Sequence, residues 1–103
     1  MKKPPFLEAV RVETERAREE LAAVAFDLKP VREAVLKAAG EGLEEVRIVV
    51  PGFADLRATK AAQELTKYLR DCGFAVEWEH RILEEDGRTV SRCDLVVAWR
   101  AGL

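Results

Sequence analysis

The chain has 103 residues, of which 49% are apolar and 35% charged, and its formal net charge at pH 7 is −2. This length suits a single domain, 1–103, and the composition excludes an intrinsically disordered chain. The near balance of charge gives no bulk attraction to nucleic acid or to an anionic membrane. No apolar run approaches the roughly 18 residues that a membrane span requires, and the charged start MKKPPFLEAVRVE is not that of a signal peptide.

Amide and hydroxyl residues are scarce. The chain has no Asn, a single Gln at Gln63 and a single Ser at Ser91, and it uses more Arg than Lys. This composition is typical of proteins that work at high temperature, although a GC-rich genome produces much of the same bias. We infer a thermophilic bacterium, or a virus (phage) that infects one, as the source.

The two cysteines, Cys72 and Cys93, show neither metal-binding nor redox spacing. One ends a predicted helix and the other begins a predicted strand, so we interpret both as small, buried residues with free thiols. Free thiols are consistent with a reducing compartment, and we expect a cytoplasmic protein.

The first third of the chain predicts two helices. After a loose arm over residues 1–5, an amphipathic helix is expected over 6–26, and Pro30 makes a break near 27–29 and starts a second helix that Gly40 and Gly42 close. The short connection predicts a helical hairpin over 6–42, with its helices antiparallel or at a steep angle. In the first helix, apolar or small residues alternate at spacings of three and four, which is a heptad seam: Leu7, Val10, Thr14, Ala17, Leu21, Val24 and Leu28.

Residues 43–100 predict a β-α-β-β core. The β-branched stretch 46–50 indicates a strand, and Asp55 is the expected N-cap of the helix that follows. An apolar stripe along that helix precedes a C-terminal cap at Gly73: Ala58, Ala61, Ala62, Leu65, Leu69 and Cys72. Two alternating strands then flank Asp86-Gly87, the signature of a type I′ hairpin turn.

That turn sets the hairpin register. If Glu85 lies opposite Arg88, the same register away from the turn places four further residues of the first strand opposite four of the second: His80 opposite Cys93, Trp78 opposite Leu95, Val76 opposite Val97 and Phe74 opposite Trp99. The strand after Gly73 carries more charge and suits an edge. We therefore expect an α+β fold with a small, three-stranded mixed sheet in the order 1-3-2. The central helix should cover the Trp78 face, and the N-terminal hairpin should cover part of the other face or pair with a second copy.

Two groups of residues carry side chains that could support chemistry or binding. His80 beside Cys93 could activate a thiolate or begin a zinc site, but Glu79 and Asp94 point to the opposite face, and zinc needs three or four ligands. A structural pair is the simpler interpretation, so we predict no catalytic residue, no metal, no cofactor and no enzymatic activity. Four cations around the central helix could contact nucleic acid or an anion, although acidic residues interleave with them: Arg57, Lys60, Lys67 and Arg70.

The heptad seam either packs on the chain's own sheet or builds an interface. The N-terminal helices carry more apolar residues than the second sheet face can cover, and a large exposed apolar patch is rare on a monomer. We predict a homodimer, or a complex with another protein, through Leu7, Val10, Leu21 and Val24. The function predicted is that of a small non-catalytic accessory or regulatory protein acting through protein–protein contacts; the alternative is a nucleic-acid-binding module.

Overall fold

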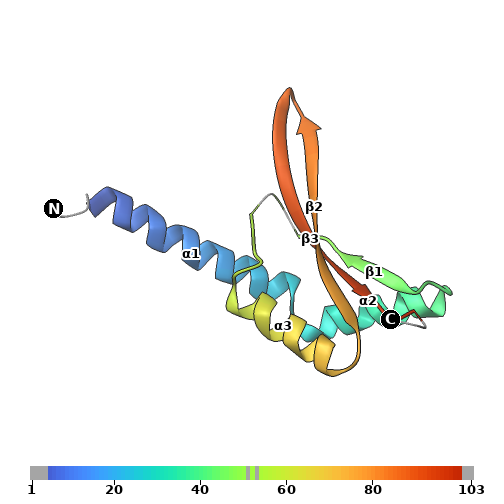
Figure 1. Cartoon of the computed structure of the whole chain (residues 1–103). Coiled ribbons are helices and arrows are strands. Elements are labelled where there is room, and N and C mark those ends of the chain that lie inside the picture. The colour runs from blue at the N-terminus through green and yellow to red at the C-terminus, as the bar shows by residue number, and fades with distance from the viewer. Residues whose placement is uncertain (1–4, 51, 53, 101–103) are drawn as a thin grey trace.

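A computed structural model describes residues 5–50, 52 and 54–100 of the chain. The elements, in chain order, are helices α1 (Pro5–Ala25) and α2 (Leu28–Gly40), strand β1 (Glu45–Ile48), helix α3 (Lys60–Asp71), and strands β2 (Ala75–Glu85) and β3 (Arg88–Ala98). The predicted α+β fold is confirmed (Figure 1). Most of the predicted loose arm, residues 1–4, lies outside the described residues, whereas Pro5 begins α1, a position that its missing N–H group allows.

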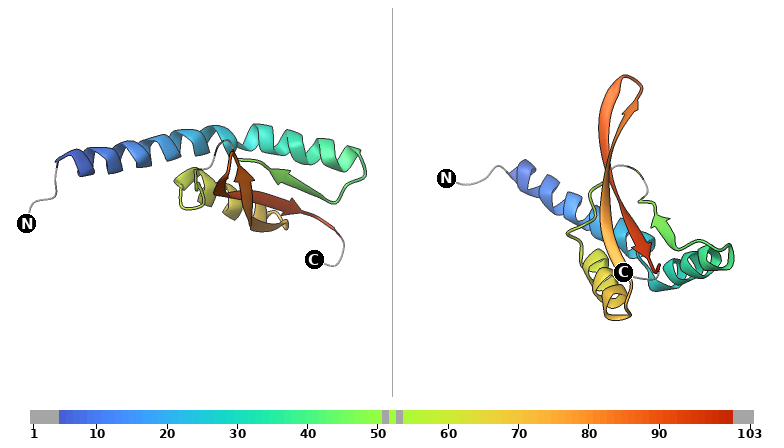
Figure 2. Two further views of the ribbon diagram at one scale, coloured as in Figure 1. Left: turned by 90° about the horizontal axis from the view of Figure 1, so that it is seen from above. Right: turned by 45° about the vertical axis from the view of Figure 1, so that its right-hand side comes forward.

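The N-terminal helices do not form a hairpin. All views show α1 and α2 following each other nearly end to end (Figures 1 and 2). The prediction failed at Pro30, because α2 begins two residues earlier, at Leu28. A proline in the first turn of a helix removes no internal hydrogen bond. Only Phe26 and Asp27 therefore connect the two helices, and the Phe26 N–H still bonds to the Ala22 carbonyl at 2.8 Å.

The sheet has the predicted order β1-β3-β2. Both neighbouring pairs are antiparallel, so the sheet is antiparallel rather than mixed. The hairpin register is confirmed from Glu85 opposite Arg88 through Trp78 opposite Leu95 to Val76 opposite Val97. Asp86 and Gly87 have φ values of 50° and 73°, as a type I′ turn requires.

The β2–β3 ribbon is longer than the rest of the sheet. Strand β1 pairs with β3 only from Glu45 opposite Ala98 to Ile48 opposite Leu95, so the half of the ribbon nearer the turn lies beyond it. Figure 1 shows this half projecting from the body. Strand β1 was predicted to continue to Val50, but Val50 leaves the ladder and donates its N–H to a side chain of β3 instead.

All three helices lie on one face of the sheet. The core includes Ala22 of α1, Val31 of α2 and Phe26 of the segment between them, together with Leu65 and Leu69 from α3 and Leu95 and Val97 from β3. The Phe26 ring meets the Trp78 ring edge-on, with centroids 5.7 Å apart. The N-terminal helices therefore share the Trp78 face with α3, contrary to the prediction that they cover the other face. Fully burying a large apolar side chain contributes about 1.5–3 kcal/mol, so the burial of Phe26 against Trp78 favours this face.

Helix α3 begins later than predicted. Thr59, not Asp55, is the N-cap, and its hydroxyl accepts a hydrogen bond from the Ala62 N–H at 3.3 Å. Ala58 is consequently outside the helix and exposed, and Cys72 is exposed rather than buried. Gly73 has a φ of 98°, consistent with the predicted C-terminal cap.

Candidate interaction surface

Helix α1 is attached to the body by its C-terminal part only. Ala22 is its one buried residue, and α1 packs mainly against α3. The N-terminal half projects into solvent (Figure 1). Hydrophobic burial therefore stabilises only the second half of this helix, and an unpacked helical segment is marginally stable in water.

The heptad seam of α1 is exposed. The four predicted interface residues leave much of their surface in solvent: Leu7 (40%), Val10 (45%), Leu21 (40%) and Val24 (76%). The seam forms one side of a groove of about 560 Å³, and Ala54, from the segment before α3, lies across from it. No described residue fills this groove, so the seam is free to contact another helix.

Charged side chains border the groove. Glu13 lies on one side of the seam and Arg18 on the other, and both line it. Arg16, farther around the helix, forms ion pairs with both Glu13 and Glu20. Hydrogen bonds from Arg16 lower the pKa of Glu13. Glu13 is therefore ionised at neutral pH, and the groove has one acidic and one basic border.

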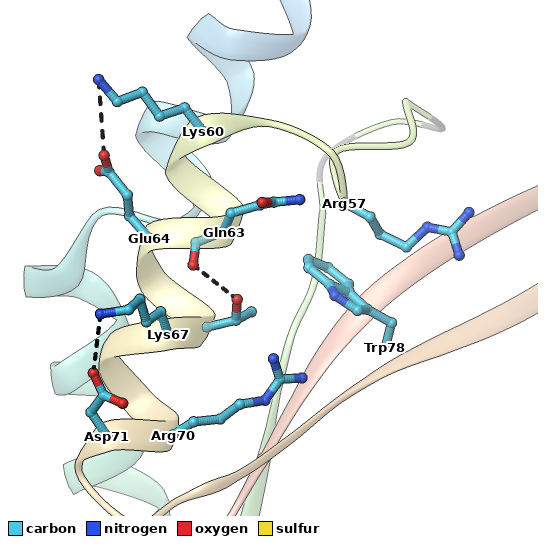
Figure 3. Close-up of a pocket in the computed structure, with 9 residues that line it drawn as sticks. Arg57, Lys60, Gln63, Glu64, Lys67, Arg70, Asp71 and Trp78 are labelled. Atoms are coloured by element: carbon cyan, nitrogen blue, oxygen red, sulfur yellow. Dashed lines mark hydrogen bonds and ion pairs between the residues drawn. The ribbon is translucent and has the colours of Figure 1, made fainter.

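The predicted basic face lines a second groove, of about 700 Å³, along α3. Figure 3 shows Arg70 extending toward the half-buried Trp78, while the Arg57 guanidinium is directed away from that ring and Lys60 and Lys67 point toward acidic residues. The position of Trp78 in its strand indicated only the core face, and its place in this groove follows from the packing of α3. The structure thus brings the four predicted cations onto one region of the surface.

Each of these cations already has a partner. Asp55 accepts hydrogen bonds from Arg57 Nε at 3.0 Å and Nη2 at 2.8 Å. Lys60 Nζ lies 3.9 Å from Glu64 Oε1, and Lys67 Nζ lies 3.6 Å from Asp71 Oδ2. Arg70 donates to the carbonyl of Val76 at 3.1 Å. The carboxylates compensate this positive charge only in part, because the pairs of Lys60 and Lys67 are highly exposed and Arg70 contacts a neutral carbonyl. Binding of a phosphate backbone depends on such charge.

The N-terminus of α3 is also occupied. The Lys60 N–H, in the first turn of α3, donates to Glu19 of α1 at 3.1 Å. The first turn of α3 contains no acidic residue, so Glu19 supplies negative charge to this end of the helix from a different element. The contact ties α1 to α3 where α1 meets the body, and it disfavours an anion at that site.

His80 and Cys93 are paired across the hairpin, as the register predicts. Their environments differ, because His80 is exposed and Cys93 is buried. Among the described residues, no three His, Cys, Asp or Glu side chains lie close enough together to hold a metal ion. The structure thus gives the pair neither an acidic third member nor further ligands.

Asp94 is a buried acid that sequence reasoning assigned to the uncovered sheet face. It has no exposed surface, its Oδ1 accepts the Val50 N–H at 3.2 Å, and Arg92 Nε lies 3.3 Å from the same oxygen as an ion pair. Its Oδ2 makes no hydrogen bond within the described residues. Nearby on this face, Arg47 of β1 donates to Glu79 of β2 at 2.6 Å, across the central strand. Asp94 fixes the exit of the chain from β1.

Comparisons with known proteins return no relative. No protein-family model matches the chain, and neither does a curated protein or a solved structure. Among the described residues, no helix has the length and apolar character needed to cross a membrane. The function has to be inferred from the surfaces of the molecule itself.

Proposed function

We propose that this chain is a small, non-catalytic accessory or regulatory protein that acts through protein–protein contacts, and that it forms a homodimer through α1. The observation that carries this proposal is the exposed heptad seam on a helix whose first half projects from the body. Leu7, Val10 and Leu21 each leave at least 40% of their surface in solvent.

A second copy is the occupant that the seam fits best. A heptad seam buries its residues against another helix with the same repeat, and α1 is such a helix. Homodimers with twofold symmetry are the commonest assemblies of soluble proteins. The small residues Thr14 and Ala17, in the middle of the seam, allow two α1 helices to approach closely.

The test is the mass of the protein in solution. Light scattering coupled to size exclusion, at tens of micromolar protein, is expected to give twice the chain mass of 11.6 kDa. Val10→Gln, on the seam, should shift the mass toward one chain. Val12→Gln is the matched control, because Val12 is exposed on the same helix but lies off the seam.

A single-chain mass for the unaltered protein would contradict the proposal, and so would equal association of the two variants. A nucleic-acid titration at several salt concentrations examines the alternative function. Tight binding with a steep negative salt dependence would favour that alternative over the proposed one.

A further inference from the structure

The charges beside the seam distinguish between the two directions in which α1 helices can pair. The seam consists of two alternating heptad positions. One is occupied by Leu7, Thr14 and Leu21, and the other by Val10, Ala17 and Val24. The acidic residues Glu13 and Glu20 then occupy the position that flanks one side of the seam. The basic residues Arg11 and Arg18 occupy the position that flanks the other side.

All four flanking residues are exposed. Neither Arg11 nor Arg18 forms an ion pair with any described residue. Glu13 and Glu20 pair only with Arg16 of the same helix, at its outer side. Exposed ion pairs of this kind are weak, and Arg18 interacts with Asp55 only beyond ion-pair distance, so the flanking charges can still meet those of a second helix.

An antiparallel pair would bring like charges together. In that arrangement each flanking position meets the same position of its partner. Arg11 would lie beside Arg18 of the second copy, and Glu13 beside Glu20. A shift in register does not remove the conflict, because both basic residues share one position and both acidic residues share the other.

A parallel pair has the opposite outcome. In a parallel pair, the acidic flanking position of one helix lies beside the basic flanking position of the partner helix, five residues further along its sequence. Glu13 then meets Arg18 of the second copy, and the twofold axis repeats the pair. From these charges we propose that two copies pair through α1 in parallel and in register; this inference rests on the proposed homodimer.

The layers of the seam accept this arrangement. In register, each seam residue meets its own equivalent, so Leu7 packs on Leu7 and Val10 on Val10 of the second copy. The central layer buries Thr14, whose hydroxyl already donates to the Val10 carbonyl at 2.8 Å. Burial of Thr14 therefore leaves no hydroxyl donor unsatisfied.

The shape of the chain is also compatible with it. The first half of α1 projects from the body of the chain (Figure 1), so two such halves can lie side by side in the proposed pair. Both bodies then lie at the same end of the helix pair. The inner half of the seam, at Leu21, borders the groove opposite Ala54 of its own chain.

Charge reversal tests the direction of pairing. Glu13→Arg should weaken self-association roughly three- to tenfold in a parallel pair, because two attractive contacts become repulsive. Arg18→Glu should weaken it similarly, and an equimolar mixture of the two variants should associate as the unaltered protein does. In an antiparallel pair, Glu13→Arg would instead strengthen association by relieving contact with Glu20, which would overturn the inference.

Disulfide trapping gives an independent result. In a Cys72→Ser background, mild oxidation of Leu7→Cys should give a covalent dimer, whereas a mixture of Leu7→Cys and Val24→Cys should give no 7–24 bond. A 7–24 bond would overturn the parallel arrangement but leave the homodimer intact. A monomeric mass for the unaltered protein would instead overturn the proposed function, and a mass above two chains would overturn pairwise association.

Discussion

Asp94 shows how one polar side chain holds an irregular junction. Val50 leaves the ladder after β1, and its N–H would lack a partner without Asp94 Oδ1. We expect Asp94→Ala to lower the free energy of unfolding by about 1–3 kcal/mol, the usual cost of leaving a buried donor unsatisfied. Asp94→Asn, which keeps an oxygen for Val50, should cost less. Urea unfolding measures both, and an Ala variant as stable as the unaltered protein would contradict this role.

Asp55 and Arg57 provide a pH-dependent contribution to stability. Hydrogen bonds from Arg57 lower the pKa of Asp55 from its ordinary 3.8 to about 2. Because the folded-state pKa is depressed, the contribution is present above about pH 4 and is lost as the pH falls toward 2. The pair is about half exposed, so it contributes at most about 1 kcal/mol.

Comparison with Asp55→Asn isolates this contribution. We expect the unaltered protein to be the more stable of the two at pH 5 and the difference to shrink by pH 2, as measured by thermal unfolding. Other acidic groups, including Glu13, are common to both proteins and cancel in the comparison. A difference that stays constant, or grows, as the pH falls would show that the carboxylate is not the source.

At the scale of the element, the β2–β3 hairpin depends on its turn. Gly87 has a φ of 73° with no heavy atom near the position of an added Cβ, so backbone strain alone opposes a side chain there. We expect Gly87→Ala to destabilise the protein by about 1 kcal/mol. Gly40→Ala is the matched control, since Gly40 ends α2 with similar open space and no positive φ. Thermal unfolding compares them, and an equal effect of the two changes would contradict the strain argument.

The hairpin was also the element that the sequence predicted best. Asp86-Gly87 and the alternation around Trp78 and Leu95 independently require the same register, which is the one observed. The start of α2 was not predictable in this way, because Pro30 fits either the first position or the third position of a helix. The direction of α2 after α1 depends on the packing of Phe26 against Trp78, which local patterns do not contain.

The surfaces were predictable to different degrees. Heptad spacing located the seam of α1, and residue type alone located the cations around α3. The spacing of four residues indicates the partners of Lys60 and Lys67. The partner of Arg57 was not predictable, because Asp55 was assigned to a helix cap that Thr59 occupies instead. Strand alternation assigned Asp94 to the uncovered face correctly, but its burial arises because Val50 leaves the ladder, a tertiary event.

At the scale of the whole molecule, the proposed assembly changes which parts of the chain are stable. The first half of α1, residues 5–16, contains no buried residue, whereas α3 supplies Ala62, Leu65 and Leu69 to the core. A helical end without packing frays readily, and a dimer would bury its seam. Dimerisation also follows mass action, so protection gained from it depends on protein concentration.

Hydrogen exchange should reveal this dependence. We expect amide protection over residues 5–16 to increase from low to high micromolar protein, while protection in α3 stays unchanged. Val10→Gln should abolish the increase, and Val12→Gln should leave it intact, because only Val10 belongs to the seam. If residues 5–16 were equally protected at both concentrations, contacts within one chain would have to stabilise the projecting helix, and the seam would not need a second copy.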